Sequence, residues 1–159
     1  MLARRPYSLG EMRRALEKKF TDSAQVRAAI ARLRDLHYLD DKKFAEHYAS
    51  SLARNRAYGR HRVRRELKAK LVDYRQIEPA LAQAFEETSE HELLEQTLDK
   101  KIRTLRLPLT RPKLAALCHS LLRRGFRGDD IMKAVRARPE LRPTSDDVEL
   151  SETSEAGEV

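Results

Sequence analysis

The most charged part of the sequence, residues 54–70, carries eight arginines and lysines against a single acidic residue, Glu66. Val63, Leu67 and Leu71 recur within it at helical spacing and predict the buried side of a helix. At about 100° per residue, the outward row of that helix consists of His61, Arg62, Arg65 and Lys68. A guanidinium presents forked donors that match phosphate oxygens, so this row predicts a surface that binds a polyanion.

A second basic cluster, Arg123, Arg124 and Arg127, surrounds Phe126 late in the chain. Two clusters on separate helices would follow a long polyanion better than they would hold a small ligand. Tyr58 precedes the first cluster and has two interpretations: its ring stacks on a base, or it seals the start of the helix. The predicted binding residues are Arg54, Arg56, Tyr58, Arg60, Arg62, Arg65, Lys68, Arg123, Arg124 and Arg127.

Residues that commonly carry out catalysis are scattered along the sequence. The five histidines fall in different predicted helices, and the sequence contains no His-Glu-x-x-His motif, no paired cysteines and no glycine-rich phosphate loop. Asp40 and Asp41 can be imagined as a metal pair, but we favour the interpretation that they begin a helix. Cys118 lies on an apolar stripe and is interpreted as a small core residue. We therefore expect a protein that is not an enzyme and has no cofactor or metal.

The elements that must position these side chains are helices. Apolar residues follow helical spacing along almost the whole chain, and neither alternating β-branched runs nor hairpin-turn dipeptides occur. The second helix is expected to begin at Asp22 or Ser23, and Asp40 and Gly59 are expected to begin the third and fourth helices. Pro79 fits only a first turn, which predicts a helix starting near Ile77. The sequence predicts an all-α fold of about eight helices with no sheet.

The sequence also repeats itself after a shift of 51 residues. Apolar and polar positions both coincide: the pairs include Met12 with Val63, Leu16 with Leu67, Lys19 with Lys70 and Asp22 with Asp73. A third, shorter copy includes Cys118, Leu122, Phe126, Ile131 and Val135. We expect an elongated stack of three-helix units. Its divisions are residues 1–57, 58–108, a shortened unit at 109–142, and a disordered acidic tail at 143–159.

Charge and cysteine content limit the classes of partner and the cellular compartment that we expect for the protein. The net charge is +8, although residues 143–159 carry six acids and no base. The basic helices have two interpretations: they steer polyanions toward the protein, or they only keep its surface solvated. The acidic segment also has two: it competes with DNA for the basic face, or it only makes the chain more soluble. One cysteine excludes an internal disulfide, and no apolar run approaches the roughly 18 residues of a membrane span. We expect a cytoplasmic protein that does not bind membranes.

Three segments together resemble the signature of RecX proteins. They are HYLDDKKFAE at residues 37–46, YGRHRVRREL at 58–67, and RRGF at 123–126 followed by Asp130 and Ile131. The resemblance covers about residues 4–138. It implies tandem three-helix repeats, binding to RecA and its filament on single-stranded DNA, and mostly inhibition of ATP hydrolysis and strand exchange. It also implies a role in recombination, DNA repair and the SOS response in the bacterial cytoplasm.

From the resemblance and the charge we expect a monomer that binds RecA, and binds single- or double-stranded DNA weakly and in a salt-dependent way. Two alternatives stay open from the residues alone. One is a helix-turn-helix regulator that reads duplex DNA, although its outward residues suit phosphates better than bases. The other is a helical-repeat scaffold whose basic face meets acidic protein and does not act on RecA.

Overall fold

The computed structural model describes residues 5–143, and within that range the chain is helical with no strand. The α-helices are α1 (Leu9–Glu17), α2 (Ser23–Asp35), α3 (Asp41–Arg56), α4 (Arg60–Ala69), α5 (Tyr74–Glu87), α6 (Glu90–Ile102), α7 (Arg111–Arg123) and α8 (Gly128–Arg136). A short 3₁₀ helix, η1, follows at Pro139–Leu141. The predicted all-α fold is confirmed. The predicted acidic tail lies outside the described residues, apart from Pro143.

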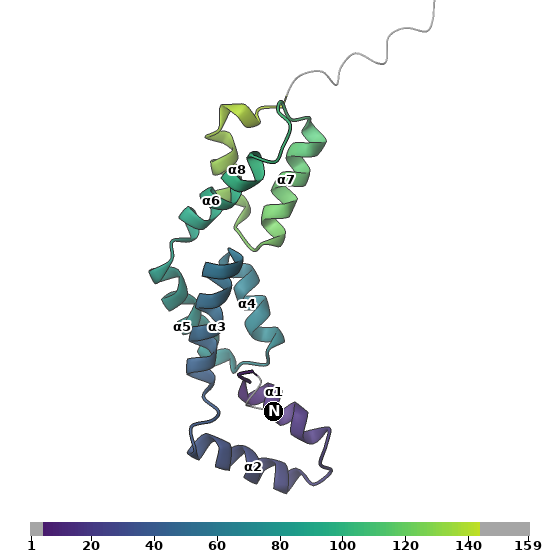
Figure 1. Ribbon diagram of the computed structural model, residues 1–159, viewed down its shortest axis with the longest axis vertical. Helices are drawn as coiled ribbons and strands as arrows, with labels where there is room; N and C mark the ends of the chain where they lie inside the picture. Colours follow the sequence, from purple (N-terminus) through teal and green to yellow (C-terminus); the bar gives the residue numbers. More distant parts are fainter. Residues whose placement is uncertain (1–4, 144–159) are drawn as a thin grey trace, which may run out of the picture.

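The helices form an elongated body of successive groups (Figure 1). The first unit is the pair α1–α2, the second unit is α3–α5, and the third unit is α6–α8, because these helices pack mainly on one another. The most extensive packing joins α3 to α5 and therefore crosses the expected division between residues 57 and 58. A repeat period sets the spacing of equivalent helices but does not say which helix begins a unit. In the structure the second unit begins with α3 rather than with α4, while the repeat period is the same.

The apolar core has two parts. One continuous cluster runs through the second and third units, and its fully buried members include Leu67, Leu81 and Leu121. A smaller cluster of Met12, Val26, Ile30 and Leu39 holds the first unit together. The first unit is consequently joined to the rest of the molecule by polar contacts more than by shared core.

Helix starts follow the sequence in most cases. The side chain of Asp22 accepts hydrogen bonds at the start of α2, Asp40 does so for α3, and Gly59 precedes α4, as predicted. The expected start near Ile77 is wrong, because Asp73 caps α5 and the helix begins at Tyr74. Pro79 thus lies in the second turn. Its ring nitrogen cannot bond the carbonyl of Arg75, which lies on an exposed part of the helix.

Candidate nucleic-acid interface

The second and third units meet where the start of α4 touches the turn between α7 and α8. The Gly59 N–H donates to the Arg124 carbonyl at 2.8 Å, and the His61 N–H donates to the Gly125 carbonyl at 3.2 Å. Two N–H groups at the start of α4 are therefore bound by carbonyls at the end of α7. This contact, which we call the second joint, fixes the two predicted basic clusters relative to each other.

Two glycines make the second joint possible. A Cβ on Gly59 would lie 2.5 Å from the Gly125 carbonyl oxygen, and a Cβ on Gly125 would overlap the backbone of Arg62. Gly125 also has a φ of +93°, a conformation that side chains with a Cβ rarely adopt. The backbones of α4 and the α7–α8 turn approach this closely only because neither position has a side chain.

An equivalent contact, the first joint, links the first and second units. The Ser8 hydroxyl donates to the Lys70 carbonyl, just as the Gly59 N–H donates to the Arg124 carbonyl. The Asp41 carboxylate accepts the Leu9 N–H at 2.6 Å and also the Asp73 N–H at 3.1 Å. Asp41 is thus a structural bridge between units rather than half of a metal pair. No group of three or more metal-ligating side chains occurs within residues 5–143.

The acidic bridge recurs at the second joint. Glu90, the first residue of α6, accepts the Arg60 N–H at 2.7 Å, as Asp41, the first residue of α3, accepts the Leu9 N–H. Both joints therefore use an acid at the first helical position of the following unit. A negative side chain there also interacts favourably with the positive end of its own helix.

A cavity of about 550 Å³ lies beside the second joint. We call it the basic cleft; it is lined by His61, Arg64, Arg65, Leu122, Phe126, Arg127, Gly128 and Asp129. Three arginines and a histidine face one carboxylate there. The cleft brings Arg65 of the first predicted cluster together with Arg127 of the second, which lie far apart in the sequence.

Five of the predicted binding residues are exposed cations free to meet a ligand. Within the described part of the chain, no carboxylate lies within ion-pair distance of Arg56, Arg65, Lys68, Arg123 or Arg127. Lys101 of α6 adds to this positive region. Its pKa is lowered by burial and then by the charges of Arg124 and Arg123, so the three cations lie near one another.

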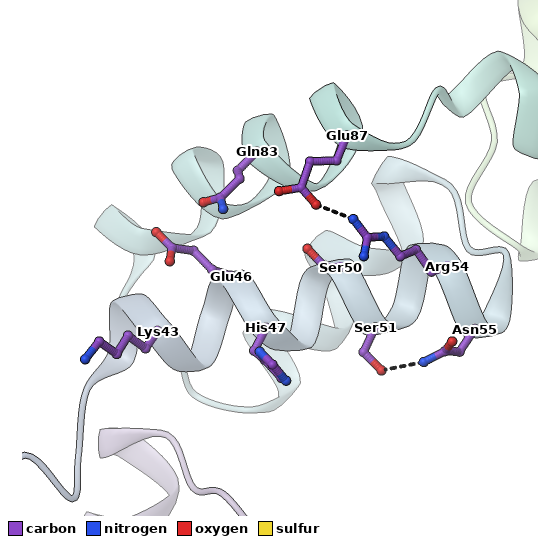
Figure 2. A pocket seen from close by; sticks show the side chains of 9 residues that line it. All are labelled: Lys43, Glu46, His47, Ser50, Ser51, Arg54, Asn55, Gln83 and Glu87. Carbon is purple, nitrogen blue, oxygen red and sulfur yellow. Dashed lines mark hydrogen bonds and ion pairs between the residues drawn. The ribbon is translucent and has the colours of Figure 1, made fainter.

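Three other predicted arginines are already paired within the protein. Arg60 lies 3.8 Å from Glu90, and Arg62 donates to Glu66 at 2.7 Å. The remaining one, Arg54, pairs with Glu87 across the groove between α3 and α5 (Figure 2). These pairs are partly exposed and can exchange partners. They nonetheless offer a ligand less than an unpaired guanidinium does.

Arg124, Tyr58 and the backbone carbonyl of Arg56 contribute to the framework of the second joint. Arg124 donates from Nη1 to the carbonyl of Arg56 at 2.8 Å. Tyr58 is half-buried against the core, with the Arg62 guanidinium 5.1 Å from its ring centroid. Of the two interpretations of Tyr58, this position supports sealing of the helix start.

Known proteins resemble this chain in both sequence and fold. A protein named regulatory protein RecX from Chlorobaculum tepidum is 34% identical over 136 residues, which cover 86% of this chain and 82% of that protein. The chain belongs to the RecX family. A second relative of the same name, from Cronobacter sakazakii, is 32% identical over 148 residues and is also covered to 86%.

Solved RecX structures share the fold of this family member. RecX from Lactobacillus salivarius superimposes with a TM-score of 0.73 at 22% identity, over 86% of this chain and 88% of that one. Another structure, titled regulatory protein RecX, gives a TM-score of 0.69 at 21% identity, over 83% of this chain and 66% of that one. The predicted stack of helical units is thus confirmed as a RecX fold.

The family model for the second three-helix domain of RecX matches residues 40–81. This range contains α3, α4 and the first half of α5, so it begins where the second unit begins. The match follows the packing of the helices rather than the expected division at residue 57. The RecX domain and the second unit therefore describe the same part of the molecule.

Several parts of the candidate interface were not predicted from the sequence. Glu90 and Lys101 were not singled out, because an isolated acid or lysine on a helix surface carries no signal of a distant partner. The contact between Gly59 and Gly125 was missed as well. Two glycines in a chain that contains only five, each next to arginines, are a signal that could have been used.

Two other expectations concern Cys118 and membranes. Cys118 is half-buried and packs against the core, and burial raises the pKa of its thiol. A raised thiol pKa leaves less of the reactive thiolate, which fits the interpretation as a core residue. No helix between residues 5 and 143 is long and apolar enough to cross a bilayer.

Proposed function

We propose that this RecX-family chain regulates RecA, mostly as an inhibitor, by lying along the RecA filament on single-stranded DNA. The observation that carries the proposal is the basic cleft, where the second joint places Arg65 and Arg127 on one cavity. The relatives are named regulatory proteins, which agrees with a binding role rather than catalysis. We also propose that the chain acts as a monomer in the cytoplasm and binds bare DNA weakly.

Charge supports a filament as the partner. Arg65, Lys68, Arg123 and Arg127 are exposed and carry no bound carboxylate among the described residues, so binding a phosphate or an acidic protein surface breaks no internal pair. Forked guanidinium donors match both kinds of oxygen. The proposed ligand contacts are therefore these four cations, with Arg54, Arg60 and Arg62 contributing after exchange of their present partners.

The elongated shape supports the proposed mode of inhibition. A body made of successive units reaches across neighbouring subunits of a filament, whereas a compact domain of this size would contact fewer (Figure 1). Bridging adjacent RecA protomers would hinder extension of the filament. It would also hold the protomers away from the arrangement that hydrolyses ATP.

The test is RecA ATPase activity on single-stranded DNA with this protein added at substoichiometric ratios. The triple variant Arg65→Glu, Lys68→Glu, Arg127→Glu removes the cations at and beside the basic cleft. We expect it to inhibit at least about tenfold less well and to lower the salt dependence of filament binding by about three in log–log slope. The lost contacts are charge contacts, so the wild-type advantage shrinks as salt is raised.

A matched control separates the location of charge from its amount. The variant Arg14→Glu, Arg27→Glu, Arg32→Glu makes the same charge change on exposed positions of the first unit. We expect it to inhibit nearly as well as wild type. If both triple variants lose the same amount of inhibition, the basic cleft acts only through its share of the net charge. Absence of any effect of the wild-type chain on RecA would favour the DNA-binding or scaffold alternative.

A further inference from the structure

A second cavity, of about 440 Å³, lies at the other end of the second unit and is lined largely by aromatic rings. The chain has only nine tyrosine and phenylalanine residues and no tryptophan. Four of the nine line this cavity: Tyr7, Tyr38, Phe44 and Tyr48. We call it the aromatic pocket. It lies on α3 near the first joint and shares no residue with the basic cleft.

The rings of the aromatic pocket differ in how firmly they are held. Phe44 and Tyr48 stack with their centroids 5.6 Å apart and pack against the core, so they form a fixed wall. Tyr38 is 64% exposed. It follows the turn that ends α2, where its N–H donates to the Leu33 carbonyl at 2.9 Å. The fold thus holds a large aromatic ring mostly in water at the same cavity as a stacked pair, so a flat ligand in the cavity can stack on these rings.

The rim of the aromatic pocket is polar and carries one cation. Lys43, His37 and His47 line it, and the Lys70 ammonium, which pairs with Glu11 at 3.3 Å, lies 5.8 Å from the Tyr48 ring centroid. Figure 2 shows that His47 lies on α3 between Lys43 and Ser51, which also line the pocket. The one carboxylate in the lining, Asp40, already accepts the Lys43 N–H at 3.0 Å. Flat ring faces beside the Lys43 ammonium and two imidazoles that form hydrogen bonds favour a ligand that is planar and carries negative charge.

The geometry points to a pocket that binds an unpaired nucleobase of single-stranded DNA. The base stacks on Tyr38 and the Phe44–Tyr48 wall, and its phosphate lies toward Lys43 and the imidazoles. Duplex DNA does not fit, because its base faces are covered by neighbouring bases. An apolar protein side chain would fill the pocket but would leave the Lys43 ammonium, which forms no ion pair among the described residues, without a partner. This inference rests on the proposed weak binding of bare DNA and assigns a site to it, and it does not require RecA.

The test is binding of fluorescein-labelled oligo(dT), followed by anisotropy, with an abasic oligonucleotide of equal length for comparison. We expect Tyr38→Ala to weaken oligo(dT) binding about tenfold, as for loss of one stacked base, and Tyr38→Phe to bind nearly as wild type. Both wild type and Tyr38→Ala should bind the abasic strand equally, because phosphate contacts remain. Tyr74→Ala is the matched control, since Tyr74 is 74% exposed on α5 and does not line the pocket.

Three outcomes would overturn the inference. In the first, Tyr38→Ala binds oligo(dT) as tightly as wild type. In the second, it loses the same affinity for the abasic strand, which would make the ring structural. In the third, it binds oligo(dT) normally but no longer binds DNA-free RecA, which would assign the pocket to a protein side chain. The DNA assay contains no RecA, so its failure would leave the ATPase test of the proposed function unaffected.

Discussion

Arg64 and Arg65 are adjacent in the sequence but have different environments. Arg64 donates from Nε and Nη2 to the two carboxylate oxygens of Glu78 at 2.7 and 3.0 Å. This hydrogen bonding raises the pKa of Arg64 and lowers that of Glu78. Arg65 is exposed and has no such partner among the described residues. At the scale of single residues, then, the fold engages one arginine internally and leaves its neighbour for a ligand.

The Arg64–Glu78 pair gives a pH-dependent contribution to stability. A carboxyl whose pKa is lowered on folding stabilises the protein above its ordinary pKa of 4.5, and this stabilisation is lost as the pH falls through the lower folded value. Because Glu78 is well exposed, we expect Glu78→Gln to reduce the free energy of unfolding at pH 7 by less than about 1 kcal/mol. Urea unfolding followed by circular dichroism measures the difference.

Glu86, on the same helix, forms no ion pair within residues 5–143 and provides the control for that experiment. Glu86→Gln should change the free energy of unfolding less than Glu78→Gln at neutral pH. The gap between the two variants should close as the pH is lowered below 4.5. A gap that is constant across the titration would show that the Arg64–Glu78 charge interaction does not contribute to stability.

At the scale of elements, the units are joined by the starts of helices. At both joints, the first N–H of α1 or α4 donates to an acid that begins the next unit. The residue before that helix donates to a carbonyl at the end of another helix, α4 at the first joint and α7 at the second. Each joint thereby satisfies donors that a helix start leaves open. The sequence repeat therefore corresponds to a repeated contact between units in the structure.

The second joint should fail when its glycines acquire side chains. Gly125→Ala combines a left-handed backbone with a clash against Arg62, and Gly59→Ala places its Cβ 2.5 Å from the Gly125 carbonyl oxygen. We expect each to lower the free energy of unfolding by about 2–3 kcal/mol. Gly128→Ala is the control, because its Cβ would meet only Leu122 at 3.9 Å. Thermal unfolding that gives equal losses for all three variants would contradict this account.

The first joint depends on Asp41 in a similar way. Asp41→Ala leaves the Leu9 and Asp73 N–H groups without their acceptor, so we expect a loss of about 1–2 kcal/mol, comparable to loss of a helix cap. Hydrogen exchange should accelerate in α1 and α2 but not in α6–α8, because the first unit has its own small core. Lys42→Ala, at the neighbouring exposed position, should leave the exchange pattern unchanged.

At the scale of the whole molecule, charge and shape act together. The net charge of +8 includes six acids in residues 143–159, so the rest of the chain is more basic than the total indicates. Long-range attraction to a polyanion depends on this total field and is screened by salt. An elongated body spreads the field along its length, as a long partner requires (Figure 1).

Removal of residues 143–159 should strengthen binding to single-stranded DNA at low salt. The deletion raises the net charge by six, which increases the association rate, and we expect the gain to disappear near 1 M salt, where the screening length is about 3 Å. Stopped-flow association measures the rate. A chain whose acids in this segment are changed to Asn and Gln should behave as the deletion does. A gain from deletion alone would show that the segment obstructs DNA by its bulk.

The sequence by itself determined the helical class, the 51-residue repeat, the helix starts at Asp40 and Gly59, and the family. These depend on local capping and on periodicities that neighbouring residues carry. Only the tertiary structure decided the packing of α3 with α4 and α5, the approach of Gly59 to Gly125, and which arginines are paired. Those outcomes depend on residues far apart in the chain, such as Arg54 with Glu87, and no local pattern encodes which distant carboxylate a given guanidinium will meet.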